Sequence, residues 1–455
     1  MKVLKFGGTS VGTIESLRNV KRIVESLEGE KIVIVSALGG LTDRLIATAK
    51  KASEGDAGFE QDVKEMAIRH HDIIDALVAE EAKDYVRKTT DEFISQLEDV
   101  YRGLSLIRDL PERSMNQIVS FGERMSSVIV AAIIKDAKHF DSLDYIKTEK
   151  WFNRNIADRS LTEQLIRDTF SELQGATGVA GGFISRDRDS GEITNLGRGG
   201  SDYTAALIAA ALDAEELQIW TDVNGFMTAD PRIIPEARVI PRMSFIESME
   251  LCSFGAKVIY PPTIYPVFHK NIPIKILNTH NPSAPGTLIK ESKKEPEGGI
   301  CGVSSVRNTA MITVEGDLTV NVAAINSRTY NAMARNGISV YLVAQPGSDV
   351  SFSVAMTSAE SARALKVLEE EFAPELQNGE VRSIQSTADL AIIAVVGEAI
   401  KKHHGLGDRL VHTLQRHGID VKAISDGASE TTIALVVDNS NVERGLQLVH
   451  GACFS

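Results

Sequence analysis

The feature that most constrains the fold is a short unit that occurs three times: an apolar strand, a glycine-rich turn and a helix. The strands are expected at residues 3–6, 31–36 and 179–184. Continuous apolar strands are typical of parallel sheets that are buried on both faces. In open sheets of this kind, ligands bind in the crevice beyond the carboxyl ends of the strands. The sequence therefore predicts an open α/β sheet whose glycine turns converge on one crevice.

Each turn leads into a helix with a candidate cap. Residues 7–12 (GGTSVG) precede a helix at about 14–27, and residues 37–43 (ALGGLTD) precede a helix that Thr42 could cap. The third turn, residues 196–204 (LGRGGSDYT), follows a segment at 185–191 that we expect to be an exposed hairpin turn. Its helix, at 203–212, would be capped by Ser201 or Asp202.

The residues in these turns suit an anionic ligand. Glycines allow the backbone to approach a ligand closely, and a new helix points N–H groups at it. Arg198 adds a planar fork that fits a carboxylate or a phosphate. Lys5, beside Gly7 and Gly8, would suit a phosphate, although spacing alone slightly favours a surface lysine on an edge strand. No Gly-Lys-Ser/Thr closes the first turn, so it is not a Walker A loop.

The rest of this half supplies further strands and charged residues. Residues 120–126 (SFGERMS) are expected to open an apolar helix that continues to 134, with Glu123 either exposed or part of a site. A strand at 217–221 precedes a long turn at 222–232, and Lys257 follows a glycine within residues 254–262. A last strand is expected at 272–277 and a turn at 282–287. The charged segment 291–299 is typical of a linker.

The composition limits the classes of function. A net charge of −13 and a pI near 5.4 argue against binding to nucleic acid or a membrane surface. No apolar run approaches the ~18 residues of a membrane span, and the N-terminus lacks a signal-peptide pattern. Three widely spaced cysteines indicate neither a disulfide framework nor a zinc site. The pairs His70 and His71, and His403 and His404, are expected on solvated faces rather than as metal ligands. We expect a cytoplasmic protein.

The C-terminal part of the chain repeats itself at an offset of 81 residues. The superposed pairs include Ile312 and Ile393, Val314 and Val395, Gly316 and Gly397, Arg328 and Arg409, Gly337 and Gly418, Ser348 and Ser429, and Asp349 and Glu430. A constant offset without a gap indicates a duplication. Each copy is expected to run strand, helix, strand, turn, strand, helix, which is a ferredoxin-like unit. Such a pair serves as a binding or interface module, or has a purely structural role.

In order and spacing, the motifs resemble those of the aspartate kinase family. They are residues 5–11 (KFGGTSV), 197–202 (GRGGSD), 220–222 (WTD) and 254–258 (FGAKV). The tandem repeat resembles that family's regulatory pair of ACT domains, and the resemblance covers essentially the whole chain. Within the family, the chain is most similar to the kinase half of the bifunctional aspartokinase–homoserine dehydrogenases. No G-x-G-x-x-G fingerprint occurs, so we expect a monofunctional kinase or an isolated kinase portion.

The resemblance implies an amino-acid-kinase domain at 1–290, a linker at 291–300, and ACT repeats at 301–385 and 386–455. ATP, with Mg²⁺, and L-aspartate would meet over the strand ends. The implied catalytic residues are Lys5 and Lys257 on the phosphates, Asp202 holding these lysines, and Arg198 on an aspartate carboxylate. The implied substrate-binding residues are Thr42, Glu123 (for the ammonium), Arg198, Gly199 and Ser201. The implied ATP-binding residues are Lys5, Gly7, Gly8, Thr221, Asp222, Met227 (where relatives often carry Tyr), Arg232, Lys257 and Val258.

The implied chemistry fits these residue types. The side-chain carboxylate of aspartate, with a reference pKa near ~4, is already an anion at pH 7 and needs no general base. Phosphoryl transfer is mostly positioning and charge neutralisation, for which two lysines, an arginine, helix N-termini and Mg²⁺ are suited. The expected product is 4-phospho-L-aspartate, and the reaction is the first step towards lysine, threonine and methionine.

ACT pairs of this family bind an end-product amino acid, threonine or lysine, between the domains of a dimer. Tyr341 stands where lysine-sensing relatives carry aspartate, and Gln345 where threonine-sensing relatives carry glutamine; the second repeat has Asp426 at the matching position. The resemblance therefore favours threonine, at Asn326, Ile338 and Gln345, in a homodimer or a higher oligomer. Two other interpretations stay open: an amino-acid sensor without kinase activity, and a kinase for another carboxylate such as acetylglutamate.

Overall fold

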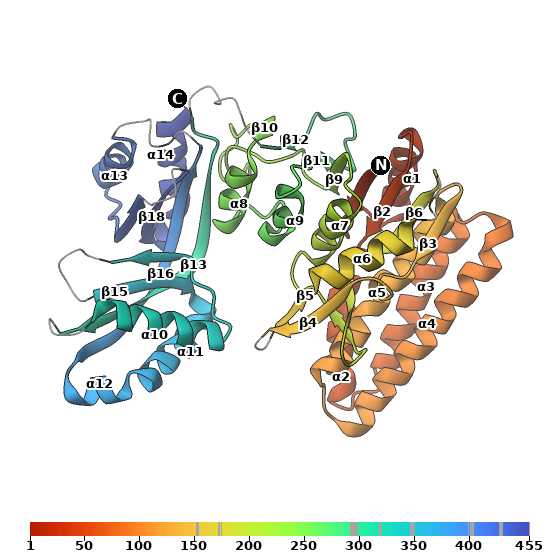
Figure 1. The fold of residues 1–455 in the computed structure, drawn as a ribbon, viewed down its shortest axis with the longest axis horizontal. Coiled ribbons are helices and arrows are strands. Elements are labelled where there is room, and N and C mark those ends of the chain that lie inside the picture. Colours follow the sequence, from red (N-terminus) through yellow and green to blue (C-terminus); the bar gives the residue numbers. More distant parts are fainter. Residues whose placement is uncertain are drawn as a thin grey trace. The chain divides into compact units, whose positions relative to one another are not determined.

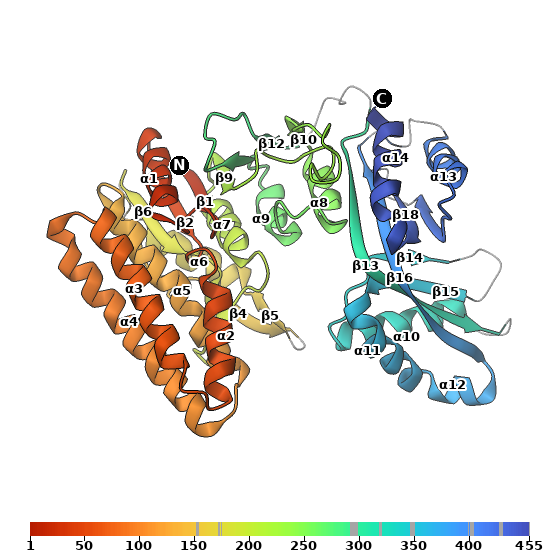
Figure 2. The same cartoon turned by 180° about the vertical axis from the view of Figure 1, so that it is seen from behind.

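The computed structural model describes residues 1–151, 154–171, 173, 175–291, 299–317, 321–345, 351–398, 400, 405–426 and 431–454. The chain forms two compact units, Met1–Phe226 with Val258–Glu291, and Met227–Lys257 with Ser292–Ser455. The segment Met227–Lys257, which we expected in the kinase domain, therefore belongs to the unit that contains the repeats. Figure 1 shows the repeats in teal to blue, and Figure 2 shows the same ribbon from behind.

The first unit is built on the predicted parallel sheet, with strands in the order β12-β11-β9-β1-β2-β6-β3. Their bounds are β1 Lys2–Phe6, β2 Lys31–Val35, β3 Ala137–Phe140, β6 Thr177–Gly181, β9 Glu216–Thr221, β11 Ile274–Asn278 and β12 Thr287–Ile289. Neighbours in this order are parallel except β11 and β12. The strands of the three predicted units, β1, β2 and β6, are direct neighbours, so their carboxyl ends lie side by side. The expectation that 272–277 is the last strand is wrong, because β12 follows the turn at 282–287.

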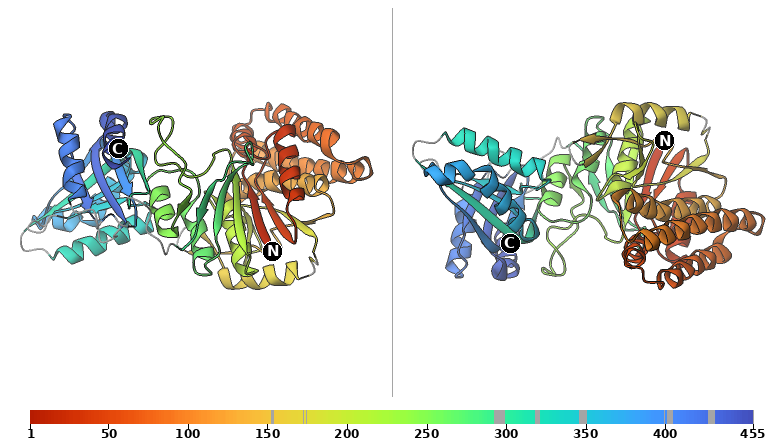
Figure 3. Two further views of the ribbon diagram at one scale, coloured as in Figure 1. Left: turned by 90° about the horizontal axis from the view of Figure 1, so that it is seen from above. Right: turned by 90° about the horizontal axis from the view of Figure 1, so that it is seen from below.

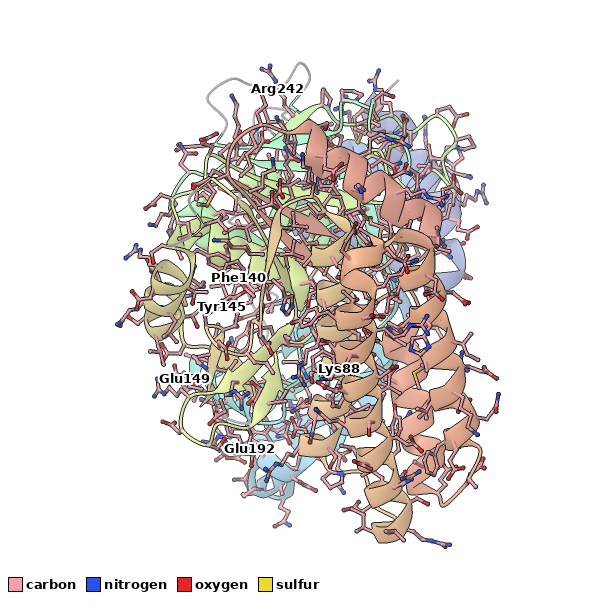
Figure 4. The ribbon with its side chains drawn as sticks, turned by 90° about the vertical axis from the view of Figure 1, so that its right-hand side faces the viewer. Lys88, Phe140, Tyr145, Glu149, Glu192 and Arg242 are labelled. Atoms are coloured by element: carbon pink, nitrogen blue, oxygen red, sulfur yellow. The ribbon has the colours of Figure 1, made fainter. Side chains whose placement is uncertain are left out.

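Helices cover both faces of this sheet. They are α1 Ile14–Ser26, α2 Leu41–Ser53, α3 Phe59–Leu77, α4 Glu80–Ile107, α5 Glu112–Ile133, α6 Arg159–Phe170, α7 Gly200–Ala211, the 3₁₀ turn η1 Pro261–Thr263 and α9 Ile264–Phe268. Figure 3 shows α6 (yellow) on one side of the sheet and the long orange helices on the other. On the α6 side, Phe140 of β3 and Tyr145, both labelled in Figure 4, pack on Phe170 with ring centroids 4.7 and 5.4 Å away. On the other side, one continuous core joins α1–α5 to β1 and β2.

Three predicted helix starts are wrong, and glycines explain two of them. α7 begins at Gly200 after Gly199, and α2 begins at Leu41 after Gly40. Both preceding glycines have positive φ (67° and 76°), and neither helix has a side-chain cap. The left-handed glycine turns the chain into the helix, so Ser201, Asp202 and Thr42 sit in the first turn instead of capping it. The third error concerns residues 120–126, which lie in the middle of α5 rather than at its start.

A small second sheet, in the order β5-β4-β7-β8, flanks the first within the same unit. Its strands are β4 Lys147–Trp151, β5 Arg154–Ala157, β7 Ile184–Asp187 and β8 Ile193–Asn195. The expectation of an exposed turn at 185–191 is wrong at its start, because β7 extends to Asp187. Ser185 is fully buried, and its hydroxyl lies 2.9 Å from that of Thr194.

The second unit contains both repeats in one antiparallel sheet, in the order β14-β15-β13-β16-β18-β17. The first copy comprises β13 Gly302–Gly316, α10 Val322–Arg335, β14 Leu342–Ala344, β15 Ser351–Thr357, α11 Ser358–Glu371 and α12 Ala373–Asn378. The second comprises β16 Val381–Val396, α13 Leu406–Arg416, β17 Ala423–Asp426, β18 Thr432–Asp438, the 3₁₀ turn η3 Asn439–Asn441 and α14 Val442–Phe454. The predicted order of elements is thus confirmed in both copies. Residues Ser348, Asp349, Ser429 and Glu430 and most of the expected linker lie outside the described residues.

The long first strands of the two copies hold this sheet together. β13 and β16 are antiparallel neighbours, with Gly302 opposite Val396 and Gly316 opposite Val381. The same unit contains the short strand β10 Arg242–Met243 and the helix α8 Phe245–Ser253 from the segment Met227–Lys257. A Ser244–Glu247 capping box begins α8.

One histidine prediction is wrong. His70, on α3, is fully buried: its Nδ1 lies 2.7 Å from the carbonyl oxygen of Met66, and burial lowers its pKa to about 4. His71 is partly exposed and pairs with Asp91, while His403 and His404 lie outside the described residues. Where the structure describes the chain, no helix is long and apolar enough to cross a membrane. Nor do the described side chains include a group of three or more His, Cys, Asp or Glu placed to hold a metal ion.

Candidate active site

The centre of the candidate site is an ion pair between Lys5 and Asp202. The Nζ atom of Lys5, on β1, lies 2.6 Å from Oδ1 of Asp202, in the first turn of α7, and each side chain is 12% exposed. β1 lies between β9 and β2, so Lys5 is not on an edge strand. A Cβ added at Gly7 would lie 3.5 Å from this Nζ. The Lys5 ammonium is therefore held over the first glycine turn, where a phosphate could reach both.

The glycine turns converge as predicted. A Cβ at Gly39 would lie 2.9 Å from the carbonyl oxygen of Gly8, so the turns after β1 and β2 touch backbone to backbone. A Cβ at Gly182, after β6, would lie 2.6 Å from the Cα of Ser201. Only glycine permits this approach. The hydroxyl of Ser36, at the end of β2, donates to that of Ser201 at 3.1 Å and ties the second turn to α7.

Glu123 is a buried carboxyl group next to these turns. Its residue exposure is 4%, and Oε1 accepts the N–H of Ala37 at 3.1 Å. Oε2 is also buried and has no hydrogen-bond partner in the described part of the chain. Burial raises the pKa of Glu123 to about 8, opposed by the Ala37 hydrogen bond and by the charge of Lys5. The interpretation of Glu123 as an exposed helix residue is wrong, and its unpartnered oxygen fits a cationic ligand such as an ammonium group.

Other expected substrate residues lie in the same turns. Arg198 is exposed and forms no ion pair within the described residues, so its guanidinium is available to an anion. Gly199 packs so tightly that a Cβ there would lie 2.1 Å from the Cβ of Tyr260. Thr42 is partly exposed in the first turn of α2. The structure therefore brings Thr42, Glu123, Arg198, Gly199 and Ser201 to the carboxyl ends of adjacent strands.

The expected nucleotide residues divide between the units. Thr221 ends β9, next to β1, and Asp222 directly follows it. The N–H of Gly7 donates to the carbonyl of Trp220 at 3.1 Å. Val258 begins the second segment of the first unit, whereas Met227, Arg232 and Lys257 belong to the second unit. Arg232 is 86% exposed and pairs with Asp230, and Lys257 is exposed.

Sequence reasoning missed a set of polar residues at the carboxyl end of β11. The side-chain amide of Asn278 donates to the carbonyl oxygen of Asp222 and, at 2.8 Å, to Oδ1 of Asn224. The hydroxyl of Thr279 lies 2.7 Å from that of Ser10, in the first turn. These contacts fix the loop after β9 against neighbouring strand ends. The signal was present, since polar Asn278 and Thr279 directly follow an apolar strand whose carboxyl end faces the same edge.

Of the expected effector residues, two contact each other. The side-chain amide of Asn326, on α10, donates to Oε1 of Gln345 at 3.0 Å. Oδ1 of Asn326 is buried without a hydrogen-bond partner among the described residues. Ile338 is buried in the core of the first repeat, so its side chain packs inward.

The first unit has the amino-acid-kinase fold, an open and mostly parallel sheet with glycine turns around the strand ends, and the second unit is a pair of ACT domains. Comparison with known proteins shows the same: the chain belongs to the amino acid kinase family, which matches residues 1–278. The ACT domain matches residues 312–372 and 393–453, two segments separated by the offset of the internal repeat.

Individual relatives are aspartokinases. The chain is 32% identical to the bifunctional aspartokinase/homoserine dehydrogenase of Haemophilus influenzae, over 100% of this chain and 57% of that protein. It is 29% identical to the chloroplastic aspartokinase 2 of Arabidopsis thaliana, over 99% of this chain and 84% of that protein. The chain thus spans little more than half the length of the bifunctional relatives it matches. The resemblance to the aspartate kinase family is confirmed.

Solved structures agree over the full length. Aspartokinase III of E. coli in complex with aspartate and ADP matches with a TM-score of 0.86 and 27% identity, covering 100% of both chains. The same enzyme in complex with lysine and aspartate matches with a TM-score of 0.75, and the aspartate kinase of Clostridium acetobutylicum with 0.79 and 26% identity.

Proposed function

We propose that this chain transfers the γ-phosphoryl group of ATP to the side-chain carboxylate of L-aspartate, giving 4-phospho-L-aspartate and ADP. The single observation that carries the proposal is the Lys5–Asp202 pair, held over a glycine turn, beside a buried carboxyl group with one oxygen that has no partner among the described residues. Support comes from the relatives named aspartokinases and from the aspartate and ADP bound in the E. coli enzyme. The reaction would begin the synthesis of the aspartate-derived amino acids.

In this mechanism, a carboxylate oxygen of aspartate attacks the γ-phosphorus, and the bond to the β-phosphate oxygen breaks. The transfer step itself moves no proton, because the attacking carboxylate is already ionised at pH 7. The difficulty is electrostatic, since two anions must meet. Lys5 neutralises charge on the transferring group, and Asp202 fixes its ammonium over Gly7. Mg²⁺, entering with ATP, neutralises the triphosphate further.

The substrate is oriented at its two other charged groups. Arg198, exposed at the tip of its glycine turn, binds the α-carboxylate through its planar fork. Oε2 of Glu123 accepts a hydrogen bond from the substrate ammonium group. The Glu123 carboxyl group becomes ionised when this cation binds. Thr42, Gly199 and Ser201 line the space between them. An N-acetylated substrate has no ammonium and would leave the buried oxygen of Glu123 unpaired.

The nucleotide would lie over Gly7 and Gly8 and the end of β9, against Thr221, Asp222 and Val258. We propose that Met227 and Arg232 also contact the nucleotide, and that Lys257 acts as a second cation on the phosphates. The kinase domain would comprise residues 1–290, and the ACT repeats residues 301–385 and 386–455, in a cytoplasmic homodimer joined through the ACT domains.

For regulation, we propose feedback inhibition by threonine, bound at the first repeat. The contact between Asn326 and Gln345 supports a polar site there. It uses the amide nitrogen of Asn326, so Oδ1 can accept a hydrogen bond from a hydroxyl or an ammonium group. Tyr341 supplies no carboxylate for the second ammonium of lysine.

The function is tested by measuring ATP-dependent ADP release with a panel of substrates. L-Aspartate should support turnover, whereas N-acetyl-L-aspartate and N-acetyl-L-glutamate should support less than a hundredth of it. Turnover with an N-acetylated substrate alone would favour a kinase for another carboxylate. Binding of amino acids without any ADP release would favour a sensor that lacks kinase activity.

A further inference from the structure

Arg69, on α3, connects the two glycine turns that meet at the candidate site. Its Nη2 donates to the carbonyl oxygen of Gly12 at 2.8 Å and to that of Gly39 at 2.9 Å. Gly12 closes the turn that follows β1, and Gly39 lies in the turn that follows β2. One nitrogen atom therefore spans both turns.

Where they begin, the turns are connected by the hydrogen bond from the N–H of Ser36 to the carbonyl oxygen of Phe6, 3.2 Å long. Further along, their backbones touch. A Cβ at Gly12 would lie 3.2 Å from the carbonyl oxygen of Gly8, and one at Gly39 would lie 2.9 Å from the same oxygen. Here the two backbones are in direct contact, with no space for a side chain between them. Such a contact fixes how close the turns can come, but it does not stop them from moving apart. The two hydrogen bonds of Arg69 supply that restraint.

The electrostatic surroundings of Arg69 indicate a dedicated role. Within the described residues it forms no ion pair with a carboxylate, and burial together with the nearby charge of Arg44 lowers its pKa. Arg44, in contrast, pairs with Glu65 and Asp62. A partly desolvated cation beside another cation is unfavourable unless its hydrogen bonds compensate. The compensation here comes from two backbone carbonyls, both in site-forming turns.

We propose that Arg69 is a positioning residue for phosphoryl transfer, an inference that rests on the proposed kinase function. The first turn carries Gly7 and Gly8 beneath the Lys5 ammonium. The second carries the N–H of Ala37, which holds Glu123. By joining the turns, Arg69 fixes the distance between the phosphate side and the amino-acid side of the site. A displacement of about 1 Å between reacting groups can cost roughly a hundredfold in rate.

Three variants test this proposal. Arg69→Met removes the hydrogen-bond donors, and Arg69→Lys keeps the positive charge. Arg44→Met is the matched control on the neighbouring helix α2. For Arg69→Met we expect kcat to fall about 30- to 100-fold, with KM for aspartate and ATP changed less than about threefold. Arg69→Lys should recover part of kcat, and Arg44→Met should retain it. Thermal unfolding of each variant separates positioning from folding.

A fourth variant, Arg69→Ala, gives a readout that a structural role alone would not move. Millimolar guanidinium, far below denaturing concentrations, should restore part of its kcat by occupying the vacated space. Wild-type kcat in folded Arg69→Met, or a loss that follows only the folded fraction and is not rescued by guanidinium, would overturn the proposal. If Arg69→Met does not fold, the kcat of Arg69→Lys and the rescue of Arg69→Ala decide in the same way. Failure of the wild-type chain to phosphorylate aspartate would instead contradict the proposed function.

Discussion

Lys5 and Asp202 form an ion pair of 2.6 Å that joins the central strand of the sheet to the first turn of α7. Lys5 lies on the strand that leads into the first glycine turn, and Asp202 lies in the helix that follows the third, so the pair links two of the strand–turn–helix units. Its low exposure distinguishes it from the surface ion pairs of the same unit.

Replacing either partner should abolish most activity and leave the fold intact. Lys5→Ala removes the cation that neutralises the transferring phosphoryl group, and Asp202→Ala releases that cation from its position. We expect kcat to fall by about 10²- to 10³-fold in each variant, as when one preorganised donor is removed. Steady-state ADP release measures kcat, and circular dichroism checks the fold.

Lys270→Ala is the matched control for these variants. It breaks the ion pair with Asp213, which is 68% exposed and lies beyond the C-terminal end of α7, away from the helix start that carries Asp202. Exposed ion pairs contribute about 0–1 kcal/mol to the free energy of unfolding, so Lys270→Ala should keep its activity and nearly all its stability. Near-normal turnover of folded Lys5→Ala or Asp202→Ala would refute the role assigned to that residue.

Glu123 should make aspartate binding depend on pH. Its pKa of about 8 means that the carboxyl group is protonated at pH 7 before substrate binds, whereas the ammonium needs the ionised form. The ionised fraction of a group with this pKa rises from roughly a tenth at pH 7 to about half at pH 8, so KM for aspartate should fall about fivefold over that range. Binding should release a proton, measurable by calorimetry in buffers of different ionisation enthalpy.

The same carboxyl group should lower the stability of the fold as pH rises, although it improves aspartate binding over the same range. Because its folded pKa lies above the unfolded value of 4.5, the folded state holds the extra proton, and this contribution to stability is lost as pH rises from 4.5 through 8. Glu123→Gln should flatten both the KM profile and this stability profile. A pH dependence that persists unchanged in Glu123→Gln would assign the titration to another group.

The two glycines beside Arg198 should respond differently to alanine. Both have positive φ, 73° at Gly197 and 67° at Gly199, which costs an alanine about 1–2 kcal/mol. Space surrounds Gly197, whereas a Cβ at Gly199 would collide with Tyr260. Gly199→Ala should therefore lose about 1–3 kcal/mol more of its free energy of unfolding, measured in urea, than Gly197→Ala does. Equal losses in the two variants would contradict the tight packing of Gly199 on Tyr260.

Effector selectivity should depend on Gln345. Threonine should inhibit the wild-type kinase more strongly than lysine does. Gln345→Ala should weaken threonine inhibition about three- to tenfold, the value of one hydrogen bond, with kcat unchanged. Asn331→Ala is the control. Asn331 lies on α10, as does Asn326, the partner of Gln345, but among the described residues its amide bonds only back to Ser327. Inhibition by lysine alone would reject threonine as the effector.

The sequence was informative where local pattern decides the structure. The apolar runs at β1, β2 and β9 and the offset between the ACT repeats are visible without any long-range information. The environment of Lys5 was not predictable in the same way, because only the pairing of β1 with the distant β9 makes it a central strand. The burial of Glu123 likewise depends on α5 packing over the turn at Ala37.

Other errors have a local explanation. The caps expected at Thr42 and at Ser201 or Asp202 were displaced by positive-φ glycines, which turn the chain without a side-chain hydrogen bond. His70 was judged by its polar neighbours in sequence, yet the helical period places it on one face with Met66 and Ile73, both buried. Helical periodicity was the better guide there.

The candidate site should join phosphate to the side-chain carboxylate of aspartate. The most direct measurement is ³¹P NMR of the wild-type chain with MgATP and L-aspartate, with hydroxylamine added afterwards to trap acyl phosphate as a hydroxamate. We expect an acyl-phosphate signal that hydroxylamine converts to aspartyl hydroxamate, and neither product with Lys5→Ala. ADP and inorganic phosphate without hydroxamate, or undiminished hydroxamate with Lys5→Ala, would contradict it.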